Sequence, residues 1–377
     1  MDRLRQLHDA GQSIWLDFID RSLLRSGELA RRMDRDSLTG MTSNPTIFEK
    51  ALAEGHAYDS QLAGASPDLS AWELFELVET DDVRAACDIF RTVHEKSKGI
   101  DGYVSIEVSP GAAHSVEHTI AEARRLWAVV ERPNVMIKVP GTAEGADAAR
   151  RLLADGINVN ITLLFSVNAY AAVIESYISA LEERAKRGLA LTTIASVASF
   201  FVSRVDTEAE KRLDAIVAAN PAKADEANTF RGRVAVANAK IAYALFTEKF
   251  SGERWEALAT RGARVQRPLW ASTSAKNPAY RDVIYVEDLI GPDTVNTMPP
   301  ATITAFADHG ETKRTVDTNI EGERALIAKL EKFGIPLGAI TDTLLREGLA
   351  SFEKSFVTLI AGLESKRRTL GVAATTP

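Results

Sequence analysis

Short strand-like runs alternate with long helical stretches along most of this 377-residue chain. Eight runs have the apolar or period-two pattern of a β-strand, namely Ser13–Phe18, Ser37–Thr42, Tyr103–Val108, Val135–Val139, Ile157–Thr162, Leu191–Val197, Pro268–Thr273 and Thr294–Met298. Strands separated by helices pair in parallel, because a parallel neighbour needs a crossover long enough to return to the same edge. Eight such units predict an α/β fold in which the parallel sheet closes into an eight-stranded (β/α)8 barrel, or TIM barrel.

An open, doubly wound sheet is the alternative architecture for the same alternation. Its dinucleotide-binding form needs a Gly-x-Gly-x-x-Gly motif after the first strand and an acidic residue about 20 positions further on, and the sequence has neither. The P-loop pattern is absent as well. The closed barrel is therefore the favoured prediction.

Helical patterns connect the strands and also extend beyond them. The amphipathic segments are Ala71–Lys98, Ser115–Val130, Ala143–Ala154, Ser166–Arg187, Thr207–Phe250 and Thr302–His309. We expect one barrel domain over residues 1–377, with a helical excursion at about 207–262 that breaks at Asn220–Pro221. C-terminal helices are expected at about 319–368, as Asn319–Phe333 and Pro336–Arg368 around a Gly334–Ile335 turn, followed by a frayed tail over Thr369–Pro377.

Charge and composition exclude several classes of protein. The 45 Lys and Arg residues against 52 Asp and Glu give a net charge of −7, and the basic residues form no stripe, so nucleic-acid binding is not expected. The N-terminus lacks an apolar signal segment, and no apolar run approaches the ~20 residues of a membrane span, so we expect a cytoplasmic protein with no membrane partner. The lone cysteine, Cys87, excludes an internal disulfide and has the spacing of a small core residue in a helix.

Lys138 is the sharpest candidate for chemistry, because it lies inside the apolar run Val135–Pro140. Desolvation disfavours the charged form of a lysine and leaves some free amine, which is the nucleophile of a Schiff-base enzyme. An edge-strand lysine, or one whose amine reaches solvent, is the structural alternative. Its position near the C-terminal end of a barrel strand favours the catalytic interpretation, because barrel active sites lie at that end.

Two carboxylates end similar runs. Asp17 follows Ile14–Leu16 and Glu107 follows Tyr103–Ile106, so both side chains sit among residues that favour burial. Asp17 could instead cap the next segment, and Glu107 could pair with a basic neighbour. Together with Lys138, they could place a base, an acid and a nucleophile around one cavity.

The fifth predicted strand has one polar and one aliphatic face. Asn158, Asn160 and Thr162 share the first by period two, while Val159, Ile161 and Leu163 share the second. A solvated face is the alternative, but a strand between two barrel neighbours has no such face. We therefore expect the polar face to point at a substrate.

His114 and His118 frame an H-x-x-E-H pattern, which is a motif of some zinc peptidases. A zinc site needs a third protein ligand, and the sequence offers none at a suitable position. No metal is predicted.

Five motifs occur in a recognisable order. They are Thr42–Thr46, Val104–Val108, Ile137–Thr142, Gly156–Ser166 and Ser199–Asp206. In this order they resemble the transaldolases, class I aldolases of the pentose phosphate pathway, over Ser13 to about Met298. The resemblance implies a (β/α)8 barrel that uses no cofactor or metal.

The resemblance also implies roles for individual residues. Lys138 resembles the Schiff-base lysine, Asp17 the acid/base at the C4 hydroxyl, and Glu107 the residue that moves protons through a water. The remaining implied contacts hold the substrate and that water (Asn160, Thr162, Asn44, Thr42), shape the site (Ser199, Phe201) and bind the sugar phosphate (Arg204).

The seventh strand departs from the pattern of many transaldolases, which have a serine followed two positions later by a phosphate-binding arginine. Here Ser272 is followed by Thr273 and Ser274, which resembles a longer bacterial branch. The second phosphate contact is thereby left open between the Ser274 hydroxyl and the charge of Lys276.

The implied activity is transfer of a dihydroxyacetone unit from sedoheptulose 7-phosphate or fructose 6-phosphate to an aldose phosphate, with sugar phosphates as the only expected partners. A Schiff-base lyase that releases free dihydroxyacetone is one alternative. A barrel that binds sugar phosphates without chemistry is another. The oligomeric state is not determined by the sequence, and a homodimer is left open.

Overall fold

The computed structural model describes residues 2–371 and contains a closed barrel of eight parallel strands in sequence order. The strands are β1 Gln12–Asp17, β2 Leu38–Thr42, β3 Tyr103–Glu107, β4 Val135–Pro140, β5 Val159–Leu164, β6 Ser196–Phe201, β7 Arg267–Ala271 and β8 Thr294–Met298. β1 pairs with both β2 and β8, so the sheet has no open edge. The predicted fold class is confirmed.

Strand register brings the candidate catalytic residues to one level of the barrel. Glu107 on β3 is paired with Lys138 on β4, and Lys138 is paired with Asn160 on β5. Asp17 on β1 is paired with Thr42 on β2. Because paired residues of neighbouring strands share a face, these side chains point to the same side of the sheet near the strand C-termini.

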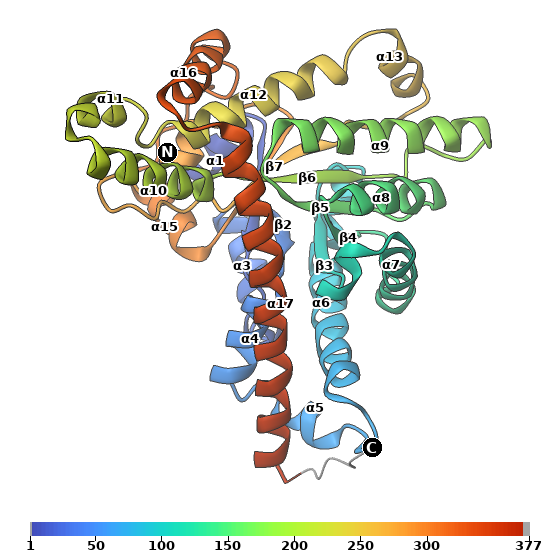
Figure 1. Cartoon of the computed structure of the whole chain (residues 1–377). Coiled ribbons are helices and arrows are strands. Elements are labelled where there is room, and N and C mark those ends of the chain that lie inside the picture. The colour runs from blue at the N-terminus through green and yellow to red at the C-terminus, as the bar shows by residue number, and fades with distance from the viewer. Residues whose placement is uncertain (1, 372–377) are drawn as a thin grey trace.

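Helices surround the barrel (Figure 1). They are α1 Arg3–Asp9, α2 Arg21–Arg25, α3 Glu28–Arg35, α4 Pro45–Glu54, α5 Asp59–Gly64, α6 Ala71–Lys96, η1 Pro110–His114, α7 Val116–Val130, α8 Ala143–Asp155, α9 Val167–Lys186, α10 Ser203–Ala219, η2 Pro221–Lys223, α11 Ala224–Asn228, α12 Val234–Lys249, α13 Glu253–Ala259, α14 Ile284–Glu287, α15 Pro300–His309, α16 Ile320–Phe333 and α17 Leu337–Thr369. Local sequence sets several of their starts. α6, for example, begins at a capping box in which Ser70 and Glu73 each bind the other's backbone N–H.

The longest helix, α17, has 33 residues and crosses the barrel (Figure 1). It contacts α10, β5, α6 and α4. Gly348 permits its close approach to β5, because a Cβ atom there would lie 3.2 Å from Cδ2 of Leu163. Leu163 itself has a left-handed φ of +58° at the end of β5.

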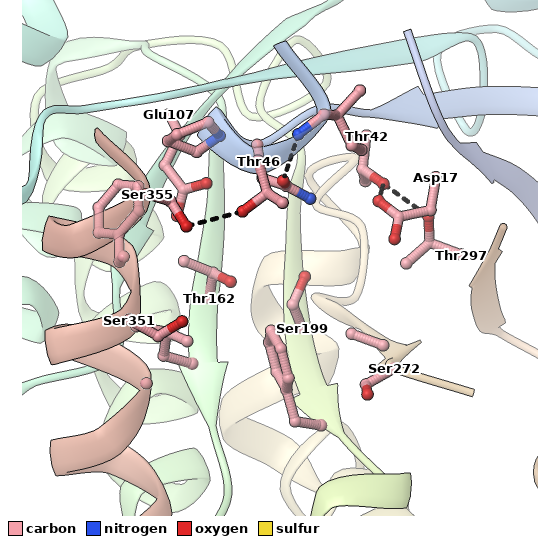
Figure 2. Close-up of a pocket in the computed structure, with 18 of the residues that line it drawn as sticks. Asp17, Thr42, Thr46, Glu107, Thr162, Ser199, Ser272, Thr297, Ser351 and Ser355 are labelled. Atoms are coloured by element: carbon pink, nitrogen blue, oxygen red, sulfur yellow. Dashed lines mark hydrogen bonds between the residues drawn. The ribbon is translucent and has the colours of Figure 1, made fainter. Parts of the chain in front are cut away.

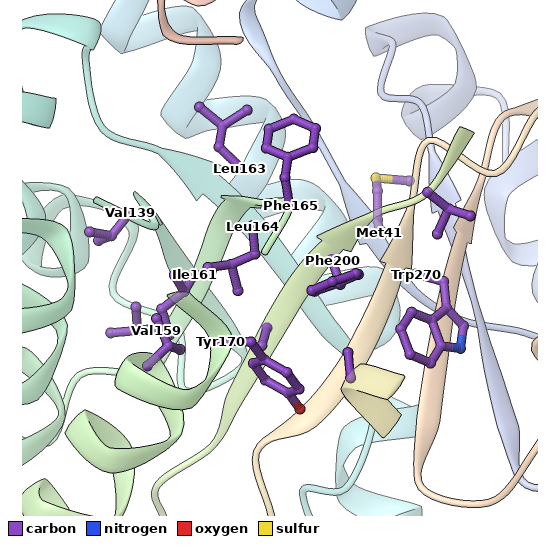
Figure 3. Close-up of a cluster of buried hydrophobic side chains, with 14 of the residues drawn as sticks. Met41, Val139, Val159, Ile161, Leu163, Leu164, Phe165, Tyr170, Phe200 and Trp270 are labelled. Atoms are coloured by element: carbon purple, nitrogen blue, oxygen red, sulfur yellow. The ribbon is translucent and has the colours of Figure 1, made fainter. Parts of the chain in front are cut away.

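The hydrophobic core has two parts. Outward-facing strand residues such as Val139, Ile161 and Phe200 pack against Tyr170 and other helix residues between sheet and helices (Figure 3). A second cluster fills the barrel interior, with Trp15 as its largest member. The buried residues of that cluster are Trp15, Tyr103, Met136, Ala195, Val197, Leu269, Ala271 and Val295. The interior is therefore a packed core, and the open space lies at its C-terminal mouth.

The sixth predicted strand was the least accurate. We expected Leu191–Val197, but β6 is Ser196–Phe201, and Leu191 to Ala195 form the approach to it. Leu191 and Ile194 are buried there as loop anchors, so an apolar, β-branched run resembled a strand. The fifth strand is also displaced, by two residues, to Val159–Leu164. The other six strands differ from prediction by at most two residues at either end.

The helical excursion is present as α10 to α13, with the predicted break at Asn220–Pro221, although it begins at Ser203 instead of Thr207. The two C-terminal helices match their predicted bounds to within one residue, and the second continues to Thr369. Residues 372–377 of the predicted tail lie outside the described residues. Cys87 is a buried residue of α6, as predicted.

Candidate active site

A cavity of about 420 Å³ opens at the C-terminal end of the barrel (Figure 2). Strand ends, the loops that follow them, α4 and α17 all contribute to its wall. The predicted site residues that line it are Asp17, Thr42, Asn44, Glu107, Lys138, Thr162, Ser199, Phe201, Arg204, Ser272, Ser274 and Lys276. Residues separated by more than 250 positions in the chain thus meet around one space.

Lys138 and Glu107 form a buried pair. The Lys138 Nζ lies 2.9 Å from Oε2 of Glu107 and donates a second hydrogen bond of 2.9 Å to the carbonyl of Ser43. Burial raises the pKa of Glu107, while the Lys138 ammonium opposes that shift. The carboxylate is therefore a ready acceptor for a proton that Lys138 must lose before it can act as a nucleophile.

Asp17 is held by hydroxyl groups on neighbouring strands. Thr42 Oγ1 donates to Asp17 Oδ1 at 2.8 Å and lies 2.6 Å from Thr297 Oγ1 on β8 (Figure 2). Burial raises the pKa of Asp17, and the positive charges of Lys138, Arg204 and Lys276 reduce that rise without cancelling it. A carboxylate with raised proton affinity in a cavity can accept a proton from a substrate hydroxyl.

The polar residues of β5 have different surroundings. Thr162 lines the cavity, whereas Asn160 is fully buried beneath it and does not line it. Asn160 Nδ2 donates to Ser105 Oγ at 3.0 Å, and its Oδ1 accepts from Ser199 Oγ at 2.7 Å. Asn160 thus supports the position of Ser199, which reaches the cavity.

Asn158 does not point at the site, contrary to the expectation for this face. Its amide donates to the carbonyls of Pro133 and Val135 and accepts from the N–H of Ala195. These bonds lie where β4, β5 and β6 begin, at the opposite end from the cavity. β5 starts one residue after Asn158, so the period-two pattern extended beyond the strand.

Asn44 is the N-cap of α4. Its Oδ1 accepts from the N–H of Ile47 at 3.1 Å, which satisfies one free donor of the helix end. The Nδ2 group makes no hydrogen bond to a described residue and remains available at the cavity wall.

Two cations stand at the β6 and β7 side of the cavity. Arg204, at the start of α10, lies 5.2 Å from the ring centre of Phe201 and makes no hydrogen bond or ion pair within residues 2–371. Lys276 donates to Ser274 Oγ at 2.9 Å. Ser272 has a φ of +56°, and its hydroxyl lies 3.0 Å from that of Ser203. Unpaired guanidinium donors beside a cavity are suited to an anion such as phosphate.

One wall was missed by the sequence analysis. Gly348, Ser351, Phe352 and Ser355 of α17 line the cavity at the spacing of one helix face, and Ser355 Oγ accepts from Thr46 Oγ1 at 2.9 Å (Figure 2). The remaining lining residues that were not predicted are Pro45, Thr46, Ile47, Lys50, Leu163, Ala271, Thr297 and Pro299. The spacing of small and polar residues was visible within a predicted helix. The sequence did not show that this face of the helix points into the cavity.

His114 lies in η1 and His118 in α7. Within residues 2–371, no group of three or more His, Cys, Asp or Glu side chains is arranged to hold a metal ion. The same part of the chain contains no helix that combines the length and apolarity needed to cross a membrane.

Known proteins resemble this chain over nearly its whole length. A family model described as Transaldolase/Fructose-6-phosphate aldolase matches residues 14–363. A transaldolase of Thermobifida fusca is 49% identical over 359 residues, which cover 95% of this chain and 96% of that protein. Transaldolase 2 of a Nostoc species is 46% identical over 376 residues, covering 98% and 99% of the two chains, and a transaldolase of Mycobacterium ulcerans is 47% identical over 370 residues, covering 96% of each. Such similarity, together with the barrel and its lysine-containing cavity, shows that the chain belongs to the transaldolase/fructose-6-phosphate aldolase family.

Proposed function

We propose that this enzyme transfers a dihydroxyacetone unit from a ketose phosphate to an aldose phosphate through a Schiff base on Lys138. Its transaldolase function follows from the family match and from relatives of that name at 46–49% identity. The observation that carries the mechanism is the buried Lys138–Glu107 pair in a cavity that Asp17 and Arg204 also line. Arg204 has no ion pair with any residue that the structure describes.

In the first half of the proposed reaction, the neutral Lys138 amine attacks the C2 ketone of the donor. Loss of water from the adduct gives a protonated imine, and Glu107 supplies a proton to the departing hydroxyl through a water molecule. Thr162 at the cavity wall holds that water.

Asp17 then accepts the proton of the C4 hydroxyl, and the C3–C4 bond breaks. The protonated imine takes up the electron pair as an enamine, and the shortened aldose phosphate leaves. In the second half, C3 of the enamine attacks the acceptor aldehyde, and Asp17 returns its proton to the new C4 hydroxyl. Hydrolysis of the imine releases the product ketose phosphate and restores Lys138.

The other lining residues are proposed to bind substrate. The free Nδ2 of Asn44 and the hydroxyl of Ser199 are suited to the donor hydroxyls near C1 and C3, with Asn160 holding Ser199 in place. Thr42 orients Asp17. Phe201 supports the Arg204 guanidinium, which binds the sugar phosphate.

The loop after β7 is proposed to complete the phosphate site. Ser272 and Ser274 offer hydroxyls, and Lys276 offers a positive charge.

Borohydride reduction tests the covalent step. Incubation with fructose 6-phosphate and borohydride should add a reduced dihydroxyacetone unit or hexose phosphate to Lys138, detectable by peptide mass spectrometry. A wild-type protein that gives no adduct at Lys138 would contradict the mechanism and favour a non-catalytic sugar-phosphate-binding barrel.

Product analysis tests transfer against release. With fructose 6-phosphate and erythrose 4-phosphate, we expect sedoheptulose 7-phosphate and little free dihydroxyacetone. Release of dihydroxyacetone at the same rate with and without the acceptor would identify a lyase instead.

Further proposals concern the setting of the enzyme. We propose a single barrel domain over residues 1–377, a cytoplasmic location and no nucleic-acid partner, in keeping with the dispersed charges of the sequence. A homodimer is a proposal that light scattering at several protein concentrations would test.

A further inference from the structure

The loop that follows β7 has little regular structure of its own. From Ser272 to Val283 it contains turns and bends, yet it places Ser272, Ser274 and Lys276 at the cavity. Lys276 donates a hydrogen bond to Ser274, two residues away, and to no other residue between 2 and 371. The position of its charge relative to Arg204 therefore depends on whatever holds the rest of the loop.

Glu210 of α10 holds the middle of this loop with both carboxylate oxygens. Tyr280 donates its hydroxyl to Oε1, and Asn277 donates its side-chain amide to Oε2 at 3.2 Å. The Tyr280 ring also packs on Gly232, where a Cβ atom would lie 3.0 Å from the ring. Gly232 has a φ of +68°, so a larger residue would be both strained and crowded there.

Asp206, one helical turn earlier on α10, holds the end of the same loop. Tyr285 of α14 donates its hydroxyl to Asp206 Oδ2 at 2.8 Å, and the N–H of Ala235 on α12 donates to Oδ1 at 2.8 Å. Asp206 is 1% exposed, so these bonds are shielded from water.

Both carboxylates belong to α10, the helix whose first turn contains Arg204. Asp206 and Glu210 lie two and six residues after it on α10, and Ser203 bonds the first residue of the loop, Ser272. α10 therefore carries one phosphate-binding cation itself and fastens the loop that carries the other.

We propose that Glu210 and Asp206 are positioning residues that hold Ser274 and Lys276 opposite Arg204, so that the sugar phosphate meets a preformed site. The proposal rests on the function proposed above, because it assigns a substrate phosphate to this end of the cavity. The carboxylates do not touch substrate in this scheme. They act through Tyr280 and Asn277 of the loop and through Tyr285 of α14, which follows it. These contacts lower the conformational freedom that the loop must lose when phosphate binds.

The test compares Tyr280→Phe and Glu210→Gln with a matched control, Glu208→Gln. Tyr280→Phe removes one hydroxyl and keeps the ring on Gly232, so it should fold even if Glu210→Gln does not. Glu208 is on the same helix, but it binds Lys211 and Arg212 three and four residues away and does not reach the loop. The control therefore removes the same charge from the same helix and leaves the loop bonds intact.

We expect both loop variants to raise KM for fructose 6-phosphate by roughly 3- to 20-fold, the equivalent of one or two lost hydrogen bonds. The inhibition constant of inorganic phosphate should rise by the same factor, while kcat changes by less than about twofold. With unphosphorylated fructose as donor, the variants should match wild type, as Glu208→Gln should on both donors. A double variant, Tyr280→Phe with Glu210→Gln, should lose less than the sum of the two single losses, because both changes affect the Tyr280–Glu210 contact.

Equal losses on fructose and fructose 6-phosphate would overturn the proposal, since they would show a general structural role. Unchanged phosphate inhibition in Tyr280→Phe and Glu210→Gln would also overturn it. Phosphate binding can be measured by calorimetry without turnover, so the proposal remains testable if the wild type fails to form the Schiff base. That failure would contradict the proposed function alone.

Discussion

The two ends of the barrel both bury charged side chains, but they satisfy them differently. At the N-terminal end, Arg267 donates to Asp101 at 3.0 Å, to Ser13 at 2.7 Å and to the carbonyl of Ile100 at 2.8 Å. Asp101 also accepts bonds from Ser13 and Trp15. Both oxygens of that carboxylate have a hydrogen-bonding partner. The network closes the N-terminal end of the barrel, next to the interior core.

At the C-terminal end, the charges adjoin a cavity, and several of their hydrogen-bonding groups have no partner in the part of the chain that the structure describes. Burial raises the pKa of both Asp17 and Glu107, and Arg204 has no hydrogen-bonding partner within residues 2–371. A buried charge by itself is therefore no sign of catalysis. The C-terminal end differs in that its buried charges lack some hydrogen-bonding partners and face open space, which are the features expected of catalytic groups.

Lys138→Arg should give the largest effect at the reactive end. A guanidinium stays protonated and cannot form an imine, so turnover should fall by roughly 10⁴-fold or more while the fold persists. Steady-state kinetics, borohydride trapping and circular dichroism check this together. Activity within about tenfold of wild type, or about 1.4 kcal/mol, would remove Lys138 from the mechanism.

Asp17→Asn should stop C–C cleavage and leave imine formation intact. The amide keeps the shape of the carboxylate but cannot accept the C4 proton, and loss of a general base commonly costs about 10²–10⁴-fold in rate. Mass spectrometry should still find the donor trapped on Lys138. If the variant neither traps nor turns over, Asp17 serves binding or folding instead.

Asp101→Ala, at the N-terminal end, should lower the stability of the protein and leave its turnover nearly unchanged. It leaves the Arg267 guanidinium buried without its counter-charge, which typically costs about 3–5 kcal/mol of unfolding free energy. Urea denaturation measures that loss, and kcat of the folded fraction should stay near wild type. Glu182→Ala, which breaks part of an exposed pair with Arg254, is the control and should cost less than about 1 kcal/mol. A comparable loss in both variants would refute the distinction between the two networks.

Arg204→Ala should raise KM for fructose 6-phosphate by roughly 10- to 150-fold, because charge-assisted hydrogen bonds contribute about 1.5–3 kcal/mol. Lys276→Ala should have a smaller effect. Lys211→Ala removes a charge from an exposed position on the same helix and controls for the general field. The losses should nearly vanish with unphosphorylated fructose, and equal losses on both donors would show that Arg204 supports the barrel mouth without recognising phosphate.

The smallest expected effect is on stability, where Asp17→Asn should stabilise the protein at neutral pH. The folded-state pKa of Asp17 is raised above its ordinary value by burial, so the carboxyl contributes stability at low pH that is lost as pH rises through that pKa. The side chain of the Asp17→Asn variant does not titrate, so this loss of stability does not occur in the variant. The difference in urea midpoint between the variant and wild type should therefore increase from pH 4 to pH 8. A difference that decreases over this range would contradict the raised pKa of Asp17.

Much of the site could be predicted from local pattern. Lys138, Asp17 and Glu107 stand out because a charged residue in an apolar strand is costly to bury, and order along the chain linked them to motifs around Asn44, Thr162 and Arg204. The sixth strand could not be placed as well. Leu191 and Ile194 have strand-like character, and only pairing with β5 and β7 selects Ser196–Phe201.

Hydrophobic periodicity was enough to predict the number and type of the repeating units, because it depends on neighbours a few positions apart. The residue pattern also predicted a chemical role for Lys138 and its two carboxylates. Other features depend on the packing of distant segments: Ser351 and Ser355 face the cavity, Asn160 lies beneath it, and Tyr280 reaches Glu210. Those contacts join residues 55 to more than 300 positions apart, and such pairs meet only after the barrel has closed and α17 has packed across its mouth.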